Sequence, residues 1–153
     1  MAQPPRIPVW IESDQAVVYF VTVCEANRRE IWDNSEFFEA LKLAIEKLEE
    51  RELWFVYAVV VMPDHLHLLA SPMQDRDQEV GDLSGALKRW TNGAASDGKW
   101  EWQSGCFDRL LRREENTDEK WEYMRENPVR AGLVERWEEW PWGIGLCEWR
   151  RMS

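Results

Sequence analysis

The sequence predicts an α+β fold in which a four-stranded antiparallel sheet carries helices on one face. Runs of β-branched and aromatic residues predict the strands, and apolar residues at helical spacing predict the helices between them. These elements follow one another as strand, helix, strand, strand, helix, strand. A chain of 153 residues can bury the core of one domain. We therefore expect a single domain over 1–153, with an N-terminal arm at 1–15 and a C-terminal tail at 135–153.

The first strand and the first helix are indicated by composition and by a capping residue. Residues 16–24 (AVVYFVTVC) are β-branched and aromatic, which is typical of a buried strand. Asn34 and Ser35 supply an N-cap signal for a helix over about 36–51, whose apolar side chains recur at helical spacing. A strand followed by an amphipathic helix is therefore expected.

The centre of the chain predicts a β-hairpin. Residues 53–62 form a second strongly apolar run, and residues 65–70 form a third. Pro63 and Asp64 stand between them and break the strand pattern. Because this connection is so short, the two strands should pair antiparallel.

Three further elements complete the pattern. A second helix is expected over about 83–95, and a short fourth strand over 106–111. The resulting order is the split β-α-β pattern of ferredoxin-like folds. A third helix is capped at 116–118 and runs towards Asn127, and this C-terminal helix carries Tyr123.

The charge balance and the cysteines narrow the classes of function. A formal net charge of −10 argues against a simple nucleic-acid-binding protein, which usually carries a basic stripe. Basic residues nevertheless gather locally, so an acidic protein with a basic groove stays open. The three cysteines are far apart and support neither a disulfide framework nor a cysteine zinc site. No apolar run suits a membrane span or a signal peptide, so we expect a cytoplasmic protein with no membrane partner.

The chain has only two histidines, His65 and His67, and they lie in the predicted third strand. Residues two apart in a strand share a face, so the imidazoles should project side by side while Leu66 and Leu68 face the core. Paired imidazoles can hold a divalent metal ion, whereas two histidines on a half-exposed strand can also be inert. Spacing alone leaves both interpretations open.

Tyr123 and Asn127 are four residues apart on the predicted third helix and so share a face. Tyrosine hydroxyls are weak nucleophiles because their ordinary pKa is about 10. Beside a divalent cation, however, a tyrosine can attack phosphorus and form a covalent intermediate. Asn127 could supply an amide oxygen as a third ligand beside His65 and His67, a donor set that suits Mg²⁺ or Mn²⁺. The alternative is that Tyr123 packs its ring and Asn127 merely ends a helix.

Three segments of the chain stand out as motifs, and they are, in order, 61–69 (VMPDHLHLL), 105–109 (GCFDR) and 123–134 (YMRENPVRAGLV). They resemble motifs that occur in the same order in the REP-associated tyrosine transposases, which belong to the HUH superfamily of single-strand DNA transposases. The resemblance runs from about residue 19 to 142. It implies a metal-dependent enzyme that nicks single-stranded DNA near palindromic hairpins and rejoins it through a 5′-phosphotyrosine intermediate.

Carried over by position, the resemblance implies roles for individual residues. Tyr123 is the implied nucleophile, His65 and His67 hold the implied divalent metal, Mg²⁺ or Mn²⁺, and Asn127 matches the position of a third ligand. Asp64 stands where the family often has asparagine, and we assign it to the turn or to a hydrogen bond with a metal ligand. The implied partner is single-stranded or hairpin DNA, bound by a monomer or a homodimer.

Several side chains are candidates for DNA contacts, with ordinary solvated surface as the alternative for each cation. The cations are Lys88, Arg89, Arg109, Arg112 and Arg113. Trp90, Trp100 and Trp102 could stack on bases, although core packing is favoured for each.

Two other functions remain open. The chain could be a hairpin-DNA-binding protein without cleavage, with a regulatory or genome-organising role, or an unrelated metal hydrolase that forms no protein–DNA bond. The intact set of His65, His67 and Tyr123 favours the enzyme, because a pure binder needs none of them. The acidic balance, and Gly143-Ile144-Gly145 where we expect a more serine-rich stretch, leave the DNA-recognition surface undefined.

Overall fold

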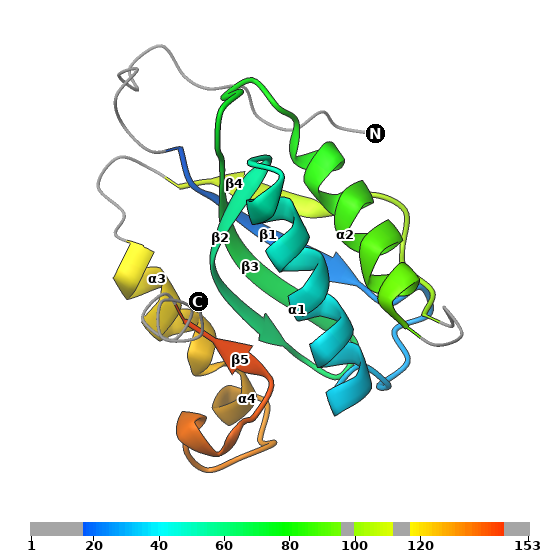
Figure 1. Ribbon diagram of the computed structural model, residues 1–153. Coiled ribbons are helices and arrows are strands. Elements are labelled where there is room, and N and C mark those ends of the chain that lie inside the picture. Colours follow the sequence, from blue (N-terminus) through cyan, green and yellow to red (C-terminus); the bar gives the residue numbers. More distant parts are fainter. Residues whose placement is uncertain (1–16, 96–99, 112–116, 146–153) are drawn as a thin grey trace.

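The computed structural model describes residues 17–95, 100–111 and 117–145 and shows an open antiparallel sheet with helices on both sides (Figure 1). In chain order the elements are β1 (Tyr19–Cys24), α1 (Ser35–Glu50), β2 (Trp54–Val61), β3 (His65–Pro72), α2 (Val80–Ala94), β4 (Phe107–Leu110), α3 (Thr117–Arg125), α4 (Asn127–Arg130), the 3₁₀ turn η1 (Trp137–Glu139) and β5 (Gly143–Ile144).

The sheet has the order β4-β1-β3-β2-β5, and every neighbouring pair is antiparallel. Its first four strands have the arrangement expected of a ferredoxin-like fold, and the predicted hairpin of β2 and β3 is confirmed. The prediction of four strands was wrong by one. β5 adds to the free edge of β2 through backbone pairing, and a strand of two residues is too short to leave an alternating apolar pattern in the sequence.

The two long helices cover one face of the sheet (Figure 1). The side chain of Asn34 accepts a hydrogen bond from the amide of Phe37 and so caps α1 as predicted. Alternate residues of the central strands are fully buried against these helices. They include Val21 and Val23 of β1 and Leu66 and Leu68 of β3, which pack with Phe37, Leu41, Ile45, Leu83 and Leu87.

The opposite face of the sheet carries a second, smaller core, and we call it the histidine face because His65 and His67 lie on it. Ala58, Val60 and Leu69 pack there against Met124 of α3. A bulge in β2 between Val56 and Ala58 changes which residues of the strand point this way. Helix α3 therefore covers the half of the histidine face formed by β2 and β3.

The described part of the C-terminal tail holds α3 in place. Gly145 lies so close to Trp121 of α3 that a β-carbon there would stand 2.6 Å from the indole ring. The indole of Trp140 donates a hydrogen bond to the carbonyl of Val61 at 3.0 Å, and the carbonyl of Trp142 accepts one from the amide of Val61. Gly145 thus allows close packing between the tail and the tyrosine helix.

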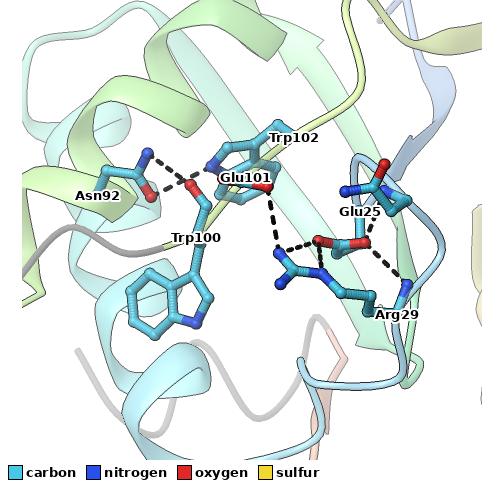
Figure 2. Close-up of polar contacts among 7 residues, drawn as sticks. Glu25, Arg29, Asn92, Trp100, Glu101 and Trp102 are labelled. Atoms are coloured by element: carbon cyan, nitrogen blue, oxygen red, sulfur yellow. Dashed lines mark hydrogen bonds and ion pairs between the residues drawn. The ribbon is translucent and has the colours of Figure 1, made fainter.

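A buried carboxylate fixes the loop that follows β1 (Figure 2). Glu25 has no exposed surface, and its carboxylate accepts hydrogen bonds from the backbone amides of Asn27 and Arg29 and from the guanidinium of Arg29. Arg29 also pairs with Glu101, which lies in the segment before β4. The loop is thereby held against that segment.

We expect the contribution of Glu25 to stability to disappear in acid. Burial on its own raises the pKa of Glu25, but the hydrogen bonds from Arg29 and Asn27 outweigh it, so the pKa lies below its ordinary value. A lowered pKa contributes stability at pH above the unfolded value of about 4.3, and this is lost as the pH falls through the folded value. Glu25→Gln should cost about 1–3 kcal/mol at pH 7 and progressively less below about pH 4, as measured by urea unfolding. Glu46→Gln, on the exposed face of α1, is the control and should change little at either pH.

Among the described residues, no helix has the length and apolar character needed to cross a bilayer.

Candidate active site

His65 and His67 project from β3 onto the histidine face, as their spacing predicts. Their ring centroids are 4.8 Å apart and the ring planes are nearly perpendicular, at 75°. Leu66 and Leu68 point the other way and are fully buried. The two imidazoles are therefore neighbours on one surface, a geometry in which both can reach the same bound ion.

Each imidazole is oriented by a hydrogen bond at its Nδ1 atom. For His65 the partner is the carboxylate of Asp64, at 2.7 Å, and for His67 it is the hydroxyl of Thr22 in β1, at 2.8 Å. Phe20 stacks on the ring of His67 with centroids 5.2 Å apart. Histidines that bind metal ions are commonly held in this way, so that the other ring nitrogen is presented to the ion.

His67 is held in its neutral form at physiological pH. Burial lowers its pKa to about 4, and the positive charges of His65, Lys120 and Arg130 act in the same direction. A neutral imidazole keeps a lone pair for a ligand or metal ion. The same effect shows that Lys120 of α3 and Arg130 of α4 lie near the histidine pair.

Tyr123 lies on the same side of the sheet, in the same chain. The ammonium of Lys120 sits 4.7 Å from the ring centroid of Phe20 and 5.0 Å from that of Tyr123, and Phe20 in turn stacks on His67. Of the three tyrosines in the chain, Tyr19 is buried and Tyr57 is half-buried, whereas Tyr123 is 56% exposed. Tyr123 is therefore the most exposed of the three tyrosines.

Arg130 joins Tyr123 to Asn127. Its guanidinium lies over the Tyr123 ring at 4.3 Å and donates to the backbone carbonyl of Tyr123 and to the side-chain oxygen of Asn127. The amide oxygen predicted as a third metal ligand thus has a hydrogen-bond partner of its own, and that role for Asn127 remains a prediction.

The donor set fits a divalent cation only if oxygen ligands complete it. Within 17–95, 100–111 and 117–145, no group of three histidine, cysteine, aspartate or glutamate side chains could hold a metal ion. His65 and His67 supply two ring nitrogens, and the oxygen of Asn127 is the predicted third ligand. Two imidazoles and an amide oxygen leave positions for water and phosphate oxygens, which suits Mn²⁺ or Mg²⁺.

The structure adds an arginine that the sequence did not indicate. Arg28 donates from Nε to Asp64 at 2.8 Å, and Asp64 holds His65, so the three side chains form a continuous chain of contacts. Burial raises the pKa of Asp64, but the hydrogen bonds from Arg28 and His65 outweigh it and keep Asp64 ionised. Arg28 has a left-handed backbone with φ +56°, a conformation that non-glycine residues rarely adopt. The predicted contact of Asp64 with a histidine is present, and Arg28 extends it.

The cations predicted to contact DNA fall in different places. The ammonium of Lys88 donates to the backbone carbonyls of Gln103 and Gly105, at 2.7 Å each, and Arg89 lies over the ring of Trp90. Both belong to α2, across the sheet from the histidines. Arg109 is exposed in β4 on the histidine face, beside Phe20 in register. Arg112 and Arg113 lie outside the described residues.

The tryptophans considered as base-stacking candidates pack within the protein. Trp100 is buried with its ring edge-on to Phe37, and Trp102 packs on Trp32. The ring of Trp90 is covered by Lys47, Arg51 and Arg89. Core packing, which the sequence favoured for each, is what the structure shows: Trp100 is buried, and Trp90 and Trp102 are partly buried against the core.

Lys120 and Arg130 could have been recognised as candidate site residues from their spacing in the sequence. Lys120 is three residues before Tyr123, and Arg130 is three residues after Asn127, so each shares a helical face with a candidate site residue. Thr22 and Arg28 carry no such signal, because they are far from the histidines in sequence.

Comparison with known proteins assigns the family. The sequence model described as "Transposase IS200 like" matches residues 14–109, which is well over half of the 153 residues. The chain belongs to the IS200-like transposase family. The match includes His65 and His67 and ends before the tyrosine helix. The motifs predict a transposase, and the family model describes that same class.

Curated relatives extend the similarity. The REP-associated tyrosine transposase of Escherichia coli (strain K12) is 25% identical over 123 residues, covering 80% of this chain and 73% of the relative. A putative REP-associated tyrosine transposase of Haemophilus influenzae (strain ATCC 51907 / DSM 11121 / KW20 / Rd) is 21% identical over 137 residues, covering 82% and 77%. The predicted resemblance to the REP-associated tyrosine transposases is thereby confirmed.

A solved structure shares the fold. The structure of a REP-associated tyrosine transposase bound to a REP hairpin superposes with a TM-score of 0.68 at 21% identity, covering 90% of this chain and 82% of that one. The mixed α+β architecture is therefore common to both proteins.

Proposed function

We propose that this IS200-like transposase is a metal-dependent single-strand DNA endonuclease and strand transferase that acts beside palindromic hairpins. The observation that carries the proposal is the placement of Tyr123, Lys120 and the pair His65 and His67 on one face of the sheet. The hairpin preference is inferred from the similar transposase whose structure holds a REP hairpin. Since its substrate is DNA, we place the enzyme in the cytoplasm.

In the proposed reaction the Tyr123 hydroxyl oxygen attacks a backbone phosphorus of a single strand. The new bond joins this oxygen to phosphorus, and the bond from phosphorus to the 3′ oxygen breaks. The 5′ phosphate stays on Tyr123, and the departing 3′ oxygen takes up the proton that the phenol gives up. Attack by another 3′ hydroxyl reverses these steps and joins a new strand.

The residues around Tyr123 suit this chemistry. Lys120 and Arg130 place positive charge beside the ring, where the phosphate would enter. His65 and His67, with Asn127 as the proposed third ligand, would hold Mg²⁺ or Mn²⁺. A bound divalent cation supplies Lewis-acid stabilisation of the negative charge on the phosphate oxygens.

Covalent capture tests the proposal. The protein is incubated with Mn²⁺ and a panel of hairpin oligonucleotides with randomised single-stranded flanks, then resolved under denaturing conditions. We expect a protein–DNA adduct that EDTA abolishes and that peptide mapping assigns to Tyr123. Hairpin binding without any adduct would instead support a binding protein with a regulatory role, and strand cleavage without an adduct would support a metal hydrolase.

Arg28→Gln should weaken metal binding without unfolding the protein. Losing the guanidinium leaves Asp64 without its 2.8 Å partner, so the carboxylate orients His65 less firmly. Changes to such supporting contacts typically cost about 10- to 100-fold in metal affinity. We therefore expect the Mn²⁺ dissociation constant, measured by calorimetry, to rise by about 10- to 100-fold in this variant. Arg136→Gln breaks an exposed ion pair with Glu138 and serves as the control. Equal Mn²⁺ affinity in the two variants would refute the role of Arg28.

A further inference from the structure

Phe107 is an exposed aromatic side chain on the open half of the histidine face. It is 67% exposed, more than any other large hydrophobic residue in the part of the chain that the structure describes. It lies in β4, an edge strand of the sheet, whereas α3 packs over β2 and β3 at the other side. A ring in this position contributes little to the core.

The strand register places Phe107 in line with the histidine pair. Phe107 lies opposite Thr22 of β1, and Thr22 lies opposite His67 of β3. Residues directly opposite one another in a sheet share a face, and adjacent strands are about 4.8 Å apart. The backbone of Phe107 is therefore roughly 10 Å from that of His67, with Thr22 between them.

The cations near this row match a nucleic acid strand. The chain has a net charge of −10, yet Arg109 follows Phe107 on the same face of β4, and Lys120 and Arg130 stand at the other end beside Tyr123. Proteins that bind single strands combine aromatic platforms for the bases with positive charge along the backbone. The row from Phe107 to Tyr123 has both.

We propose that Phe107 is a stacking platform for an unpaired base next to the phosphodiester presented to Tyr123. This inference rests on the proposed function and adds a specificity-determining contact to it. The π face of the ring accepts any base, so the contact selects for an unpaired nucleotide rather than for a sequence. It would hold the strand at one point while the cations beside Tyr123 hold its phosphate.

The test measures stacking directly, with 2-aminopurine placed in turn at each flank position of a hairpin oligonucleotide that the wild-type protein binds. Binding is followed in the Tyr123→Phe background, so that the DNA stays uncut. We expect the fluorescence to be quenched at one position. Phe107→Leu, which keeps an apolar side chain without a π face, should remove that quench and weaken binding about 5- to 100-fold. Phe107→Trp should restore both.

The controls separate this proposal from the others. Leu43→Ala alters another exposed apolar residue, 55% exposed on α1 across the sheet, and should change neither signal. If the adduct forms but Phe107→Leu binds and quenches like the wild type, the stacking proposal fails and the proposed function stands. If stacking is seen without any adduct, the proposed chemistry fails instead. Sedimentation velocity tests whether a second copy of the chain, rather than DNA, binds at Phe107. A wild-type dimer that Phe107→Leu dissociates would make this surface a contact between copies of the chain and would overturn the proposal.

Discussion

Tyr123→Phe is expected to abolish covalent capture of single-stranded DNA while hairpin binding persists. The substitution removes only the hydroxyl oxygen and keeps the ring that Lys120 and Arg130 contact at 5.0 and 4.3 Å. Removing a nucleophile that forms the covalent bond should reduce adduct formation by at least about 10³-fold. The yield of adduct on a denaturing gel, normalised to binding in a gel-shift assay, measures this effect.

Tyr57→Phe is the matched control for this experiment. Tyr57 is half-buried in β2, where its hydroxyl accepts a hydrogen bond from Ser71 at 3.1 Å. Its loss should leave the adduct yield unchanged. Persistence of the adduct in Tyr123→Phe, or its loss in Tyr57→Phe, would show that the nucleophile has been misassigned.

His67→Ala is expected to remove divalent-metal binding. His67 is neutral near pH 7 because burial and nearby positive charge lower its pKa to about 4, so it can offer a nitrogen to a cation. With only one imidazole left in the site, we expect the Mn²⁺ dissociation constant to rise by at least about 100-fold, measured by electron paramagnetic resonance of free Mn²⁺. Capture of DNA should fall in parallel.

A graded series distinguishes a metal site from a packing defect. Thr22→Val removes the 2.8 Å hydrogen bond to His67 but keeps the ring, and should weaken Mn²⁺ binding about 10- to 100-fold, less than His67→Ala. Far-UV circular dichroism should show that both variants fold. Unchanged Mn²⁺ affinity in His67→Ala would mean that the histidine pair is not the metal site.

Local patterns in the sequence were sufficient to predict most of the architecture. β-branched runs, helical spacing and the cap at Asn34 gave the strand and helix order, because each depends on residues close together in the chain. The alternation of a strand also placed His65 and His67 on one face and Leu66 and Leu68 in the core. The motifs in this order indicated the family, which the comparisons confirmed.

The surroundings of the histidine pair were decided only by tertiary structure. Thr22 and Arg28 reach the histidines through strand pairing and a turn in the left-handed region, and neither contact leaves a local signal. The contacts of Lys88 could not be predicted from the local sequence either. A lysine on a helix surface gives no sign that its ammonium will donate to two backbone carbonyls before β4.

The sequence by itself determined that two imidazoles share a face and that a tyrosine lies on a later helix. Whether that helix meets the imidazoles depended on the packing of Met124 and Trp121 onto the sheet and on Gly145, which leaves room for the indole. Because α3 packs over β2 and β3, it leaves the other half of the same face open, with Phe107 at its edge. These are long-range contacts, and their energies come from the burial of surfaces that the chain brings together only on folding.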